Sequence, residues 1–297
     1  MRAMPARTIG KSAANRNQKK TRKRRRMRSR FSLQRLLSLL PSATVRRRWW
    51  SRFRGAPLPV QVVLGAVAIA SVWLAVNWVY QVVRKPSELL FPVSGVLYKS
   101  PAETWDTYES LFRRHSTDVM TPDLLAALAQ VEGSGNPIVR TYWRWSLTGK
   151  PFEMYRPASS AVGMYQITDG TFGIARRYCV HDHVVVEDGP WDDFHSCWFN
   201  SLYTRTVPSH AVELTSAYLD RAVADTLRRR GIGSASLQQR QNLAALIHLC
   251  GAGAGESYAR RGLRLTAGQR CGDHEARVYI ARVNSMKNVF AKMERER

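Results

Sequence analysis

The segment "LLAALAQVEGSGNP", Leu124 to Pro137, carries the residue of this sequence that could most clearly do chemistry. Its apolar residues recur at helical spacing, and the predicted helix ends in a single carboxylate, Glu132, before glycines and a proline stop it. The helix dipole disfavours a carboxylate in this last turn, by a few tenths of a kcal/mol up to ~1. A carboxylic acid in a partly apolar cleft can keep its proton near neutral pH and pass it to a leaving oxygen. Glu132 is therefore either a general acid for glycosidic bond cleavage or a solvated carboxylate at a helix end.

A second segment, "PASSAVGMYQITDGTF" (157–172), has small residues at a turn followed by Gly163, Met164, Tyr165 and Gln166. Small residues allow an extended ligand to approach the backbone. Met164 and Tyr165 could form an apolar wall, and Gln166 offers a donor and an acceptor for sugar hydroxyls or amides. A buried turn that only packs has much the same pattern, so this segment is ambiguous by itself.

Two further segments lie nearer the C-terminus. "AALIHLCGAGAG" (244–255) predicts an apolar helix that runs into a glycine-rich turn, and it lacks the GxxxxGK[ST] pattern of a phosphate loop. "DHEARVYIARV" (273–283) places Tyr279 on a predicted helix. Neither segment indicates an activity by itself.

In this order and spacing, the four segments resemble the lytic transglycosylase domain with the lysozyme-like fold, found in the soluble lytic transglycosylases and related to goose-type lysozyme. The resemblance covers roughly Ser116 to Met293. "VEGSGNP" resembles the family's catalytic Glu-Ser motif, "GMYQI" its Gly-Leu-Met-Gln-Ile motif, and "EARVYIARV" its Glu-Thr-x-x-Tyr-Val motif. Each match is loose, and the order of the four carries the resemblance.

The resemblance implies a general acid/base at Glu132 and a tyrosine that lines the site at Tyr279. It also implies backbone and side-chain contacts to a glycan from four consecutive residues, Gly163, Met164, Tyr165 and Gln166. The sequence departs from the family at two places. Gly133 stands where the family usually has Ser, and His248 and Leu249 stand where the family has Tyr and Asn. His248 is therefore expected at the position of a site tyrosine.

The activity that the family implies is non-hydrolytic cleavage of the β-1,4 bond between N-acetylmuramic acid (MurNAc) and N-acetylglucosamine (GlcNAc) in peptidoglycan, with no metal or other cofactor. Glu132 would protonate the bridging oxygen, and the 6-hydroxyl of MurNAc would close a 1,6-anhydro ring. Asp169, Glu153 and Glu187 are further carboxylates, and none stands out as a nucleophile. Two alternatives keep the fold: hydrolysis of the same bond by a positioned water, or an inactive peptidoglycan-binding scaffold of a secretion or other envelope assembly.

The expected fold is mainly α-helical, a lysozyme-like catalytic domain preceded by one transmembrane helix and a basic disordered tail. The best-defined helix starts at Thr121, an N-cap followed by Pro122 and Asp123, and ends at Glu132. Further helices are expected over 102–115, 170–178, 208–230, 237–249 and 273–293, and "VVVED" (184–188) is the clearest strand. The aromatic residues of "RTYWRWSL" (140–147) and "GPWDDFHSCWF" (189–199) are expected mainly in the core, with one or two against the glycan.

The basic residues are concentrated before the first acid of the chain, Glu88. The net charge is +24, and 19 Lys and Arg residues lie within 1–57, where there is no Asp or Glu. We expect this basic tail to be cytoplasmic, with the run Lys19–Arg30 disordered and in contact with anionic lipid. Residues Phe31–Leu40 could form a short amphipathic helix on the inner leaflet. Nucleic-acid binding is disfavoured as the main role, because no recognition motif accompanies the charge.

Residues 58–83 carry no charge, and their strongly polar side chains are Gln61, Asn77 and Gln81, which still predicts a transmembrane helix. The positive-inside rule places the N-terminus in the cytoplasm. The rest of the chain is then on the periplasmic side of a bacterial inner membrane. Residues 84–102, with several prolines, are expected to be a linker, and 103–297 the exported domain.

All four cysteines lie in the exported part, as expected where oxidation is possible. Four cysteines allow three pairings, and proximity in the sequence favours Cys179 with Cys197 and Cys250 with Cys271. A zinc site that uses Cys179, Cys197 and nearby histidines is the alternative, although it lacks CxxC spacing.

Overall fold

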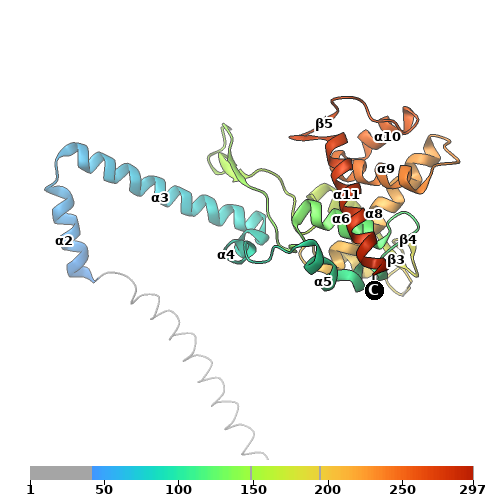
Figure 1. Cartoon of the computed structure of the whole chain (residues 1–297). Helices are drawn as coiled ribbons and strands as arrows, with labels where there is room; N and C mark the ends of the chain where they lie inside the picture. The colour runs from blue at the N-terminus through green and yellow to red at the C-terminus, as the bar shows by residue number, and fades with distance from the viewer. Residues whose placement is uncertain (1–41, 148, 194, 297) are drawn as a thin grey trace, which may run out of the picture. The chain divides into compact units, whose positions relative to one another are not determined.

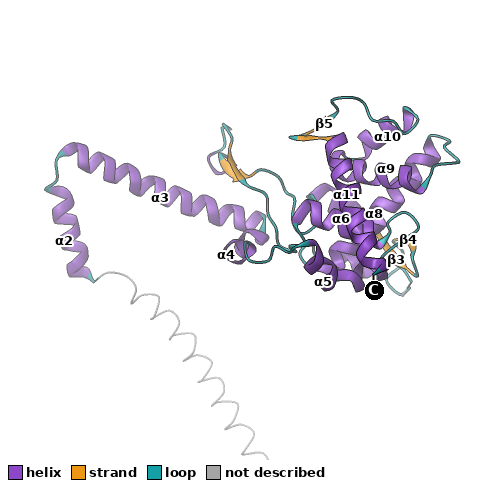
Figure 2. Ribbon diagram, in the orientation of Figure 1, coloured by secondary structure: helices purple, strands orange, loops and turns teal. Residues whose placement is uncertain are grey.

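The computed structural model describes residues 42–147, 149–193 and 195–296. This part of the chain is mainly helical, as the periodicity predicts (Figure 2). The chain divides into two compact units, Met1–Leu74 and Ala75–Arg297, and helix α3 (Leu58–Arg84) runs through the division. The predictions for Lys19–Arg30 and Phe31–Leu40 lie outside the described residues.

In the first unit, residues Ala43–Arg54 form helix α2, which corrects the expectation that the whole basic tail is disordered. The side chain of Ser42 caps this helix by accepting a hydrogen bond from the N–H of Val45 at 3.4 Å. One turn apart, the rings of Trp50 and Phe53 stack with their centroids 5.6 Å apart. Arginine is a good helix former, so the cap, the ring contact and the helix propensity of this segment all stabilise α2.

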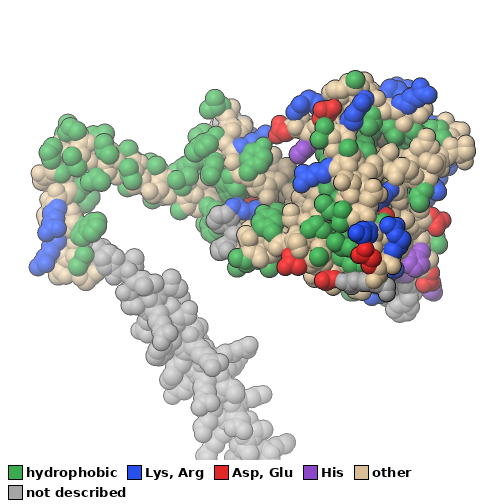
Figure 3. Space-filling view, viewed as in Figure 1, with side chains coloured by type: hydrophobic (Ala, Val, Ile, Leu, Met, Phe, Trp, Pro, Cys, Tyr) green, Lys and Arg blue, Asp and Glu red, His purple; other side chains and the backbone are tan. Residues whose placement is uncertain are grey.

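Among the described helices, α3 is the one long and apolar enough to cross a membrane, and hydrophobic side chains cover it in Figure 3. Two polar side chains near its C-terminal end, Asn77 and Gln81, are buried in the second unit. Asn77 Nδ2 donates to the carbonyl of Tyr155 at 2.7 Å, and Gln81 Nε2 donates to the carbonyl of Phe152 at 2.6 Å. The end of α3 is therefore part of the folded domain.

The predicted linker, residues 84–102, is folded as well. It forms the 3-10 helix η1 (Pro86–Leu90) and the short helix α4 (Phe91–Ser94). The carboxylate of Glu88 is fully buried, with Arg140 at 3.2 Å and the indole N–H of Trp143 donating to it at 3.0 Å. The prolines of this segment predicted a linker, but Pro86 begins η1 instead, and partners distant in sequence fix the segment in place.

The remaining helices are α5 (Pro101–Arg114), α6 (Pro122–Gly133), α7 (Asp169–Ala175), α8 (Pro208–Arg229), α9 (Leu237–Cys250), α10 (Ala252–Arg260) and α11 (Ala276–Arg295), with 3-10 helices η2 (Pro151–Glu153) and η3 (Trp198–Leu202). The predicted bounds of α5, α6, α8 and α9 agree with these to within one residue. The glycine-rich turn predicted after α9 is confined to Gly251, because the chain is helical again from Ala252. Gly255 lets α10 approach α9, since a Cβ there would lie 2.5 Å from the side chain of Ile247.

The strands form three separate antiparallel pairs: β1 (Trp143–Trp145) with β2 (Tyr155–Pro157), β3 (Tyr178–His181) with β4 (Val184–Glu187), and β5 (Arg270–Cys271) with β6 (His274–Glu275). The strand predicted at 184–188 is β4. These short hairpins extend from a helical body rather than form a shared sheet.

The core of the second unit surrounds α6, whose residues Leu124–Ala129 are fully buried. Helix α11 runs beside α6 and α9 (Figure 1). The ring of Trp105 on α5 packs against Phe112 on the same helix and Phe290 on α11, with centroids 6.2 and 5.6 Å away. A helix buried on all sides is apolar around its whole circumference, so a carboxylate at its end lies close to the core.

Both predicted disulfides are confirmed. Cys179 on β3 is bonded to Cys197 at the start of η3, and Cys250 at the end of α9 is bonded to Cys271 on β5. All four cysteines are thereby used, which leaves none as a zinc ligand. Closing loops of this length restricts the unfolded chain and contributes about 3 kcal/mol per bond in the entropic description.

A buried carboxylate, Glu213 on α8, connects α8 to β3 and to the loop after η3. It accepts hydrogen bonds from the N–H of Val180 at 3.1 Å and from the hydroxyl of Tyr203 at 2.7 Å. His115 Nδ1 lies 3.8 Å from the same carboxylate. Burial, opposed by the attraction of Glu213, lowers the pKa of His115 below its usual value.

We predict that acidification destabilises the protein partly through His115. Its folded-state pKa is below the unfolded value, so the unfolded chain binds the proton more readily, and stability falls as the pH drops through about 6.5. Urea unfolding of the full chain in detergent should show a smaller loss of stability in His115→Gln than in the wild type over this range. Burial also lowers the pKa of His210, so this second histidine contributes to the pH dependence in both proteins. Equal pH dependence of the two proteins would contradict the assignment.

Candidate active site

Glu132 lies in the last turn of α6, and the chain leaves the helix there through a sharp turn. Ser134 is left-handed (φ 47°), and its N–H donates to the carbonyl of Gln130 at 3.0 Å. The N–H of Gly135 donates to the carbonyl of Ala129 at 3.2 Å. These bonds satisfy the last carbonyls of the helix. The carboxylate is therefore fixed at a defined helix end and retains 17% of its surface exposed.

Tyr279 on α11 donates its hydroxyl hydrogen to Glu132 Oε1 at 2.5 Å. Its side chain is almost fully buried. Burial, followed by the negative charge of Glu132 and the hydrogen bond to it, raises the pKa of Tyr279 far above its usual value. The phenol consequently stays protonated and remains a donor to the carboxylate.

His248 lies in the last turn of α9, and its Nε2 is 3.6 Å from the same oxygen, Glu132 Oε1. This distance is too long for a hydrogen bond and is within the range of an ion pair if the ring is protonated. The disulfide at Cys250, two residues further on, ties this end of α9 to β5. Three residues predicted from separate segments thus come together from α6, α9 and α11.

The two oxygens of Glu132 have different surroundings. Oε1 faces Tyr279 and His248, whereas no residue in the described part of the chain donates a hydrogen bond to Oε2. A carboxyl group held through one oxygen and open at the other can exchange a proton with a bound molecule while its orientation stays fixed.

The turn 163–166 is closed by paired backbone hydrogen bonds between Val162 and Ile167, at 3.2 and 3.1 Å. Gly163 has φ +81°, and a Cβ there would lie 2.2 Å from the carbonyl oxygen of Arg205, so only glycine fits. Gln166 is left-handed as well, and its side-chain amide donates to the carbonyls of Gly163 at 2.9 Å and Val139 at 3.2 Å. The amide N–H groups of Gln166 therefore hold the turn together, and are not free for a sugar as the sequence suggested.

Met164 and Tyr165 are both fully buried. The hydroxyl of Tyr165 donates to the carbonyl of Leu125 on α6 at 3.1 Å. This corrects the expectation that these two side chains form an apolar wall for a glycan, because they pack in the core. Buried and ligand-lining apolar residues have the same sequence pattern, and only the packing separates them.

Gly133 allows this turn to lie directly against the end of α6. A Cβ on Gly133 would come within 2.8 Å of the carbonyl oxygen of Met164 and 2.9 Å of its Cα. The glycine that departs from the family motif therefore has a packing reason in this chain. The residue after Glu132 is in backbone contact with the turn, which brings the first two predicted segments together.

Arg205 is a residue of this region that the sequence did not single out. Its guanidinium donates to the carbonyls of Ser160 and Ile167 at 2.9 and 2.8 Å, and it pairs with Asp169 at 2.7 Å. It also lies over the ring of Phe172. Arg205 thus holds the loop that carries the turn in place. The residue spacing in "YTRTVP" gives no sign of these long-range contacts.

The other candidate carboxylates form ion pairs with arginines. Asp169 pairs with Arg205, Glu153 with Arg84 and Arg156, and Glu187 with Arg177 and Arg221. Within the described residues, no group of acids, histidines and cysteines could hold a metal ion. The chemistry of the site therefore depends on Glu132 and its two neighbours.

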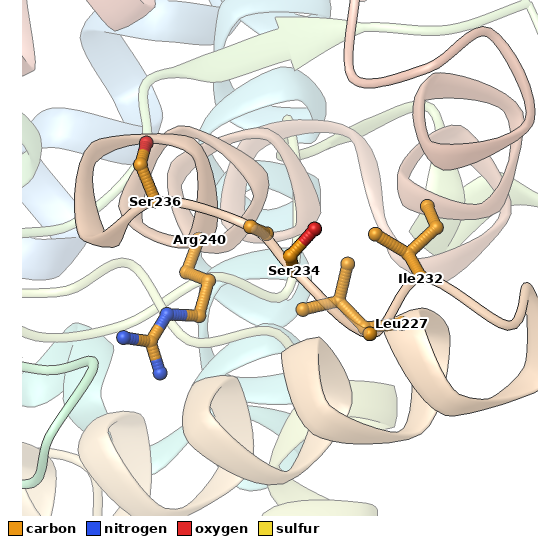
Figure 4. Close-up of a pocket in the computed structure, with 7 residues that line it drawn as sticks. Leu227, Ile232, Ser234, Ser236 and Arg240 are labelled. Atoms are coloured by element: carbon orange, nitrogen blue, oxygen red, sulfur yellow. The ribbon is translucent and has the colours of Figure 1, made fainter.

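A separate hollow lies between the end of α8 and the start of α9 (Figure 4). It is lined by Leu227, Ile232, Gly233, Ser234, Ala235, Ser236 and Arg240. It contains no residue predicted for the site and no carboxylate, so it offers no acid/base pair.

Comparison with known proteins adds no assignment: no protein-family model matches this chain, and neither does any curated protein.

We predict that Gly133→Ala destabilises the protein by about 1–3 kcal/mol, because the added methyl group forces the Met164 turn away from α6. Gly173→Ala on α7 is the matched control, since a Cβ there meets nothing within 4 Å and alanine favours a helix by up to ~1 kcal/mol. Urea unfolding of both variants in detergent measures the difference. Equal stability of the two variants would show that the backbone contact is not tight.

Proposed function

We propose that this chain is a membrane-anchored lytic transglycosylase that cleaves the MurNAc-GlcNAc β-1,4 bond of peptidoglycan, with Glu132 as general acid/base in a lysozyme-like domain. The observation that carries the proposal is the position of Tyr279 and His248 beside one oxygen of Glu132. These are the residues that the resemblance assigns to the site. They come from three helices, and the sequence alone did not require them to meet.

In the proposed reaction, Glu132 donates its proton to the oxygen between the two sugars, and the bond from that oxygen to C1 of MurNAc breaks. The acetamido oxygen of the substrate stabilises the cation at C1. The Glu132 carboxylate then takes the proton of the 6-hydroxyl as O6 bonds to C1. The 1,6-anhydro ring closes, GlcNAc leaves with a free hydroxyl, and Glu132 is protonated again without consumption of water.

Tyr279 and His248 position the acid in this scheme. A hydrogen bond from a phenol that stays protonated fixes the rotamer of Glu132. The substrate-assisted route suits this site because the other candidate acids, Asp169 and Glu153, are engaged with arginines.

We further propose that α3 anchors the protein in a bacterial inner membrane, with the N-terminus in the cytoplasm and the helical domain in the periplasm. Three features support this placement: the apolar length of α3, the concentration of positive charge before it, and two disulfides after it. Its substrate is then the glycan strand on the same side as the disulfides.

We predict that Glu132→Gln lowers the rate at which soluble products are released from peptidoglycan by a factor of roughly 100 or more, because an amide cannot donate the proton. The experiment uses the full chain in detergent, since the end of α3 belongs to the domain, and mass spectrometry of the products. Glu187→Gln, which alters a surface ion pair, is the control and should stay active.

The product masses separate the alternatives. Anhydro products support transglycosylation, and products heavier by one water support hydrolysis at the same site. A Glu132→Gln protein as active as the wild type would remove Glu132 from the mechanism. A folded wild-type protein that sediments with peptidoglycan and releases nothing would favour the scaffold role.

We predict that Tyr279→Phe lowers kcat/KM about 10- to 100-fold, since a hydrogen bond to a charged group contributes about 1.5–3 kcal/mol. Tyr258→Phe is the matched control, because Tyr258 is a buried tyrosine on α10. Turnover of peptidoglycan by both variants, with their unfolding midpoints, makes the comparison. If both variants lose activity equally, the effect is general to buried phenols and not specific to Glu132.

A further inference from the structure

We propose that the β1–β2 hairpin, residues 142–157, is a second membrane contact that lies in the lipid interface at the C-terminal end of α3. The partner is the phospholipid surface itself. This inference depends on the proposed membrane crossing of α3 and is independent of glycan cleavage.

The first observation is the level of the hairpin along α3. A hydrocarbon layer of ~30 Å needs about 20 helical residues at ~1.5 Å each, which Leu58–Asn77 supplies. Asn77 is also where the helix acquires a polar partner, the carbonyl of Tyr155 on β2. One turn later, Gln81 donates to the carbonyl of Phe152. The hairpin therefore contacts α3 at the depth where hydrocarbon gives way to headgroups.

The second observation is the composition of the exposed surface of the hairpin. Tyr142 and Trp145 are each 65% exposed, and Leu147 near the tip is completely exposed. The ring of Trp145 lies 4.8 Å from that of Tyr155, so this aromatic surface is ordered. Figure 3 shows hydrophobic side chains gathered over the hairpin beside the end of α3. Tryptophan and tyrosine at such positions are typical of membrane interfaces.

The third observation is that the apolar surface continues from helix to hairpin. The ring of Tyr80 on α3 packs against Phe152 at 5.4 Å, and each residue remains more than a third exposed. Nearby cations, Arg144 and Lys150, are exposed on the hairpin and suit anionic headgroups. A surface that combines exposed aromatics with basic residues fits a lipid interface better than it fits water.

The hairpin is also firmly attached to the helix. Buried Glu88, just after α3, pairs with Arg140 and accepts a hydrogen bond from Trp143 at the base of the hairpin. The ammonium group of Lys85 donates to the carbonyls of Ser159 and Ala161 at 3.3 and 3.0 Å. Helix end and hairpin are thus joined by several polar contacts within the second unit.

The test is tryptophan quenching in the full chain, reconstituted into phosphatidylglycerol and phosphatidylcholine vesicles whose acyl chains carry bromine near the headgroup. Trp145→Phe removes the emission of the 65%-exposed tryptophan of the hairpin, and Trp143 at its base is retained. Trp73→Phe within α3 reports insertion of the helix, and Trp191→Phe removes a 79%-exposed tryptophan on the loop after β4. Circular dichroism confirms that each variant is folded.

The proposal expects Trp73→Phe and Trp145→Phe each to reduce the emission that bromine quenches, and Trp191→Phe to leave it unchanged. A reduction with Trp73→Phe but none with Trp145→Phe would overturn the hairpin contact while α3 remains a membrane helix. No reduction with either variant would overturn the membrane crossing, and the hairpin contact with it. None of these outcomes depends on whether the protein cleaves glycan.

Discussion

The arrangement of the site depends on one close backbone contact, between the end of α6 at Gly133 and the turn at Met164. Main-chain atoms approach there to a distance that leaves no room for a Cβ. The contact is possible because the turn carries its own glycine at 163, and because Arg205 and Gln166 satisfy the carbonyls around it. The end of α6 is consequently fixed on one side by this turn and on the other by α11. The direction of the Glu132 side chain follows from these two contacts.

The cost of the arrangement is electrostatic. Glu132, Tyr279 and His248 are polar groups that retain less than a fifth of their surface, and burial of such groups is unfavourable unless they find partners. They find each other, through the hydrogen bond from Tyr279 and the proximity of His248. The second oxygen of Glu132 accepts no hydrogen bond from the described residues, and the side chain keeps 17% of its surface exposed.

The sequence predicted those features that depend on neighbouring residues. Helical spacing and caps gave the bounds of α6, α8 and α9, and the motif resemblance selected Glu132, Tyr279 and His248. The prediction was wrong where burial decides the role of a residue, since Met164 and Tyr165 look alike whether they line a groove or fill a core. It did not identify Arg205 or Glu88, because their partners lie far away in the sequence and follow no period. It assigned disorder to α2, where charge was weighed above helix propensity.

The polar residues of α3 show the same dependence on distant partners. Asn77 and Gln81 lie in an apolar helix, and each donates to a backbone carbonyl of the hairpin region. An amide in apolar surroundings without a partner would be costly, and these bonds supply the partners at the end of the apolar segment. The boundary of the folded domain therefore lies inside the apolar segment rather than after it. A fragment cut at the prolines after α3 would lose Asn77, Gln81 and Lys85 together, and would leave the carbonyls that they bind without donors.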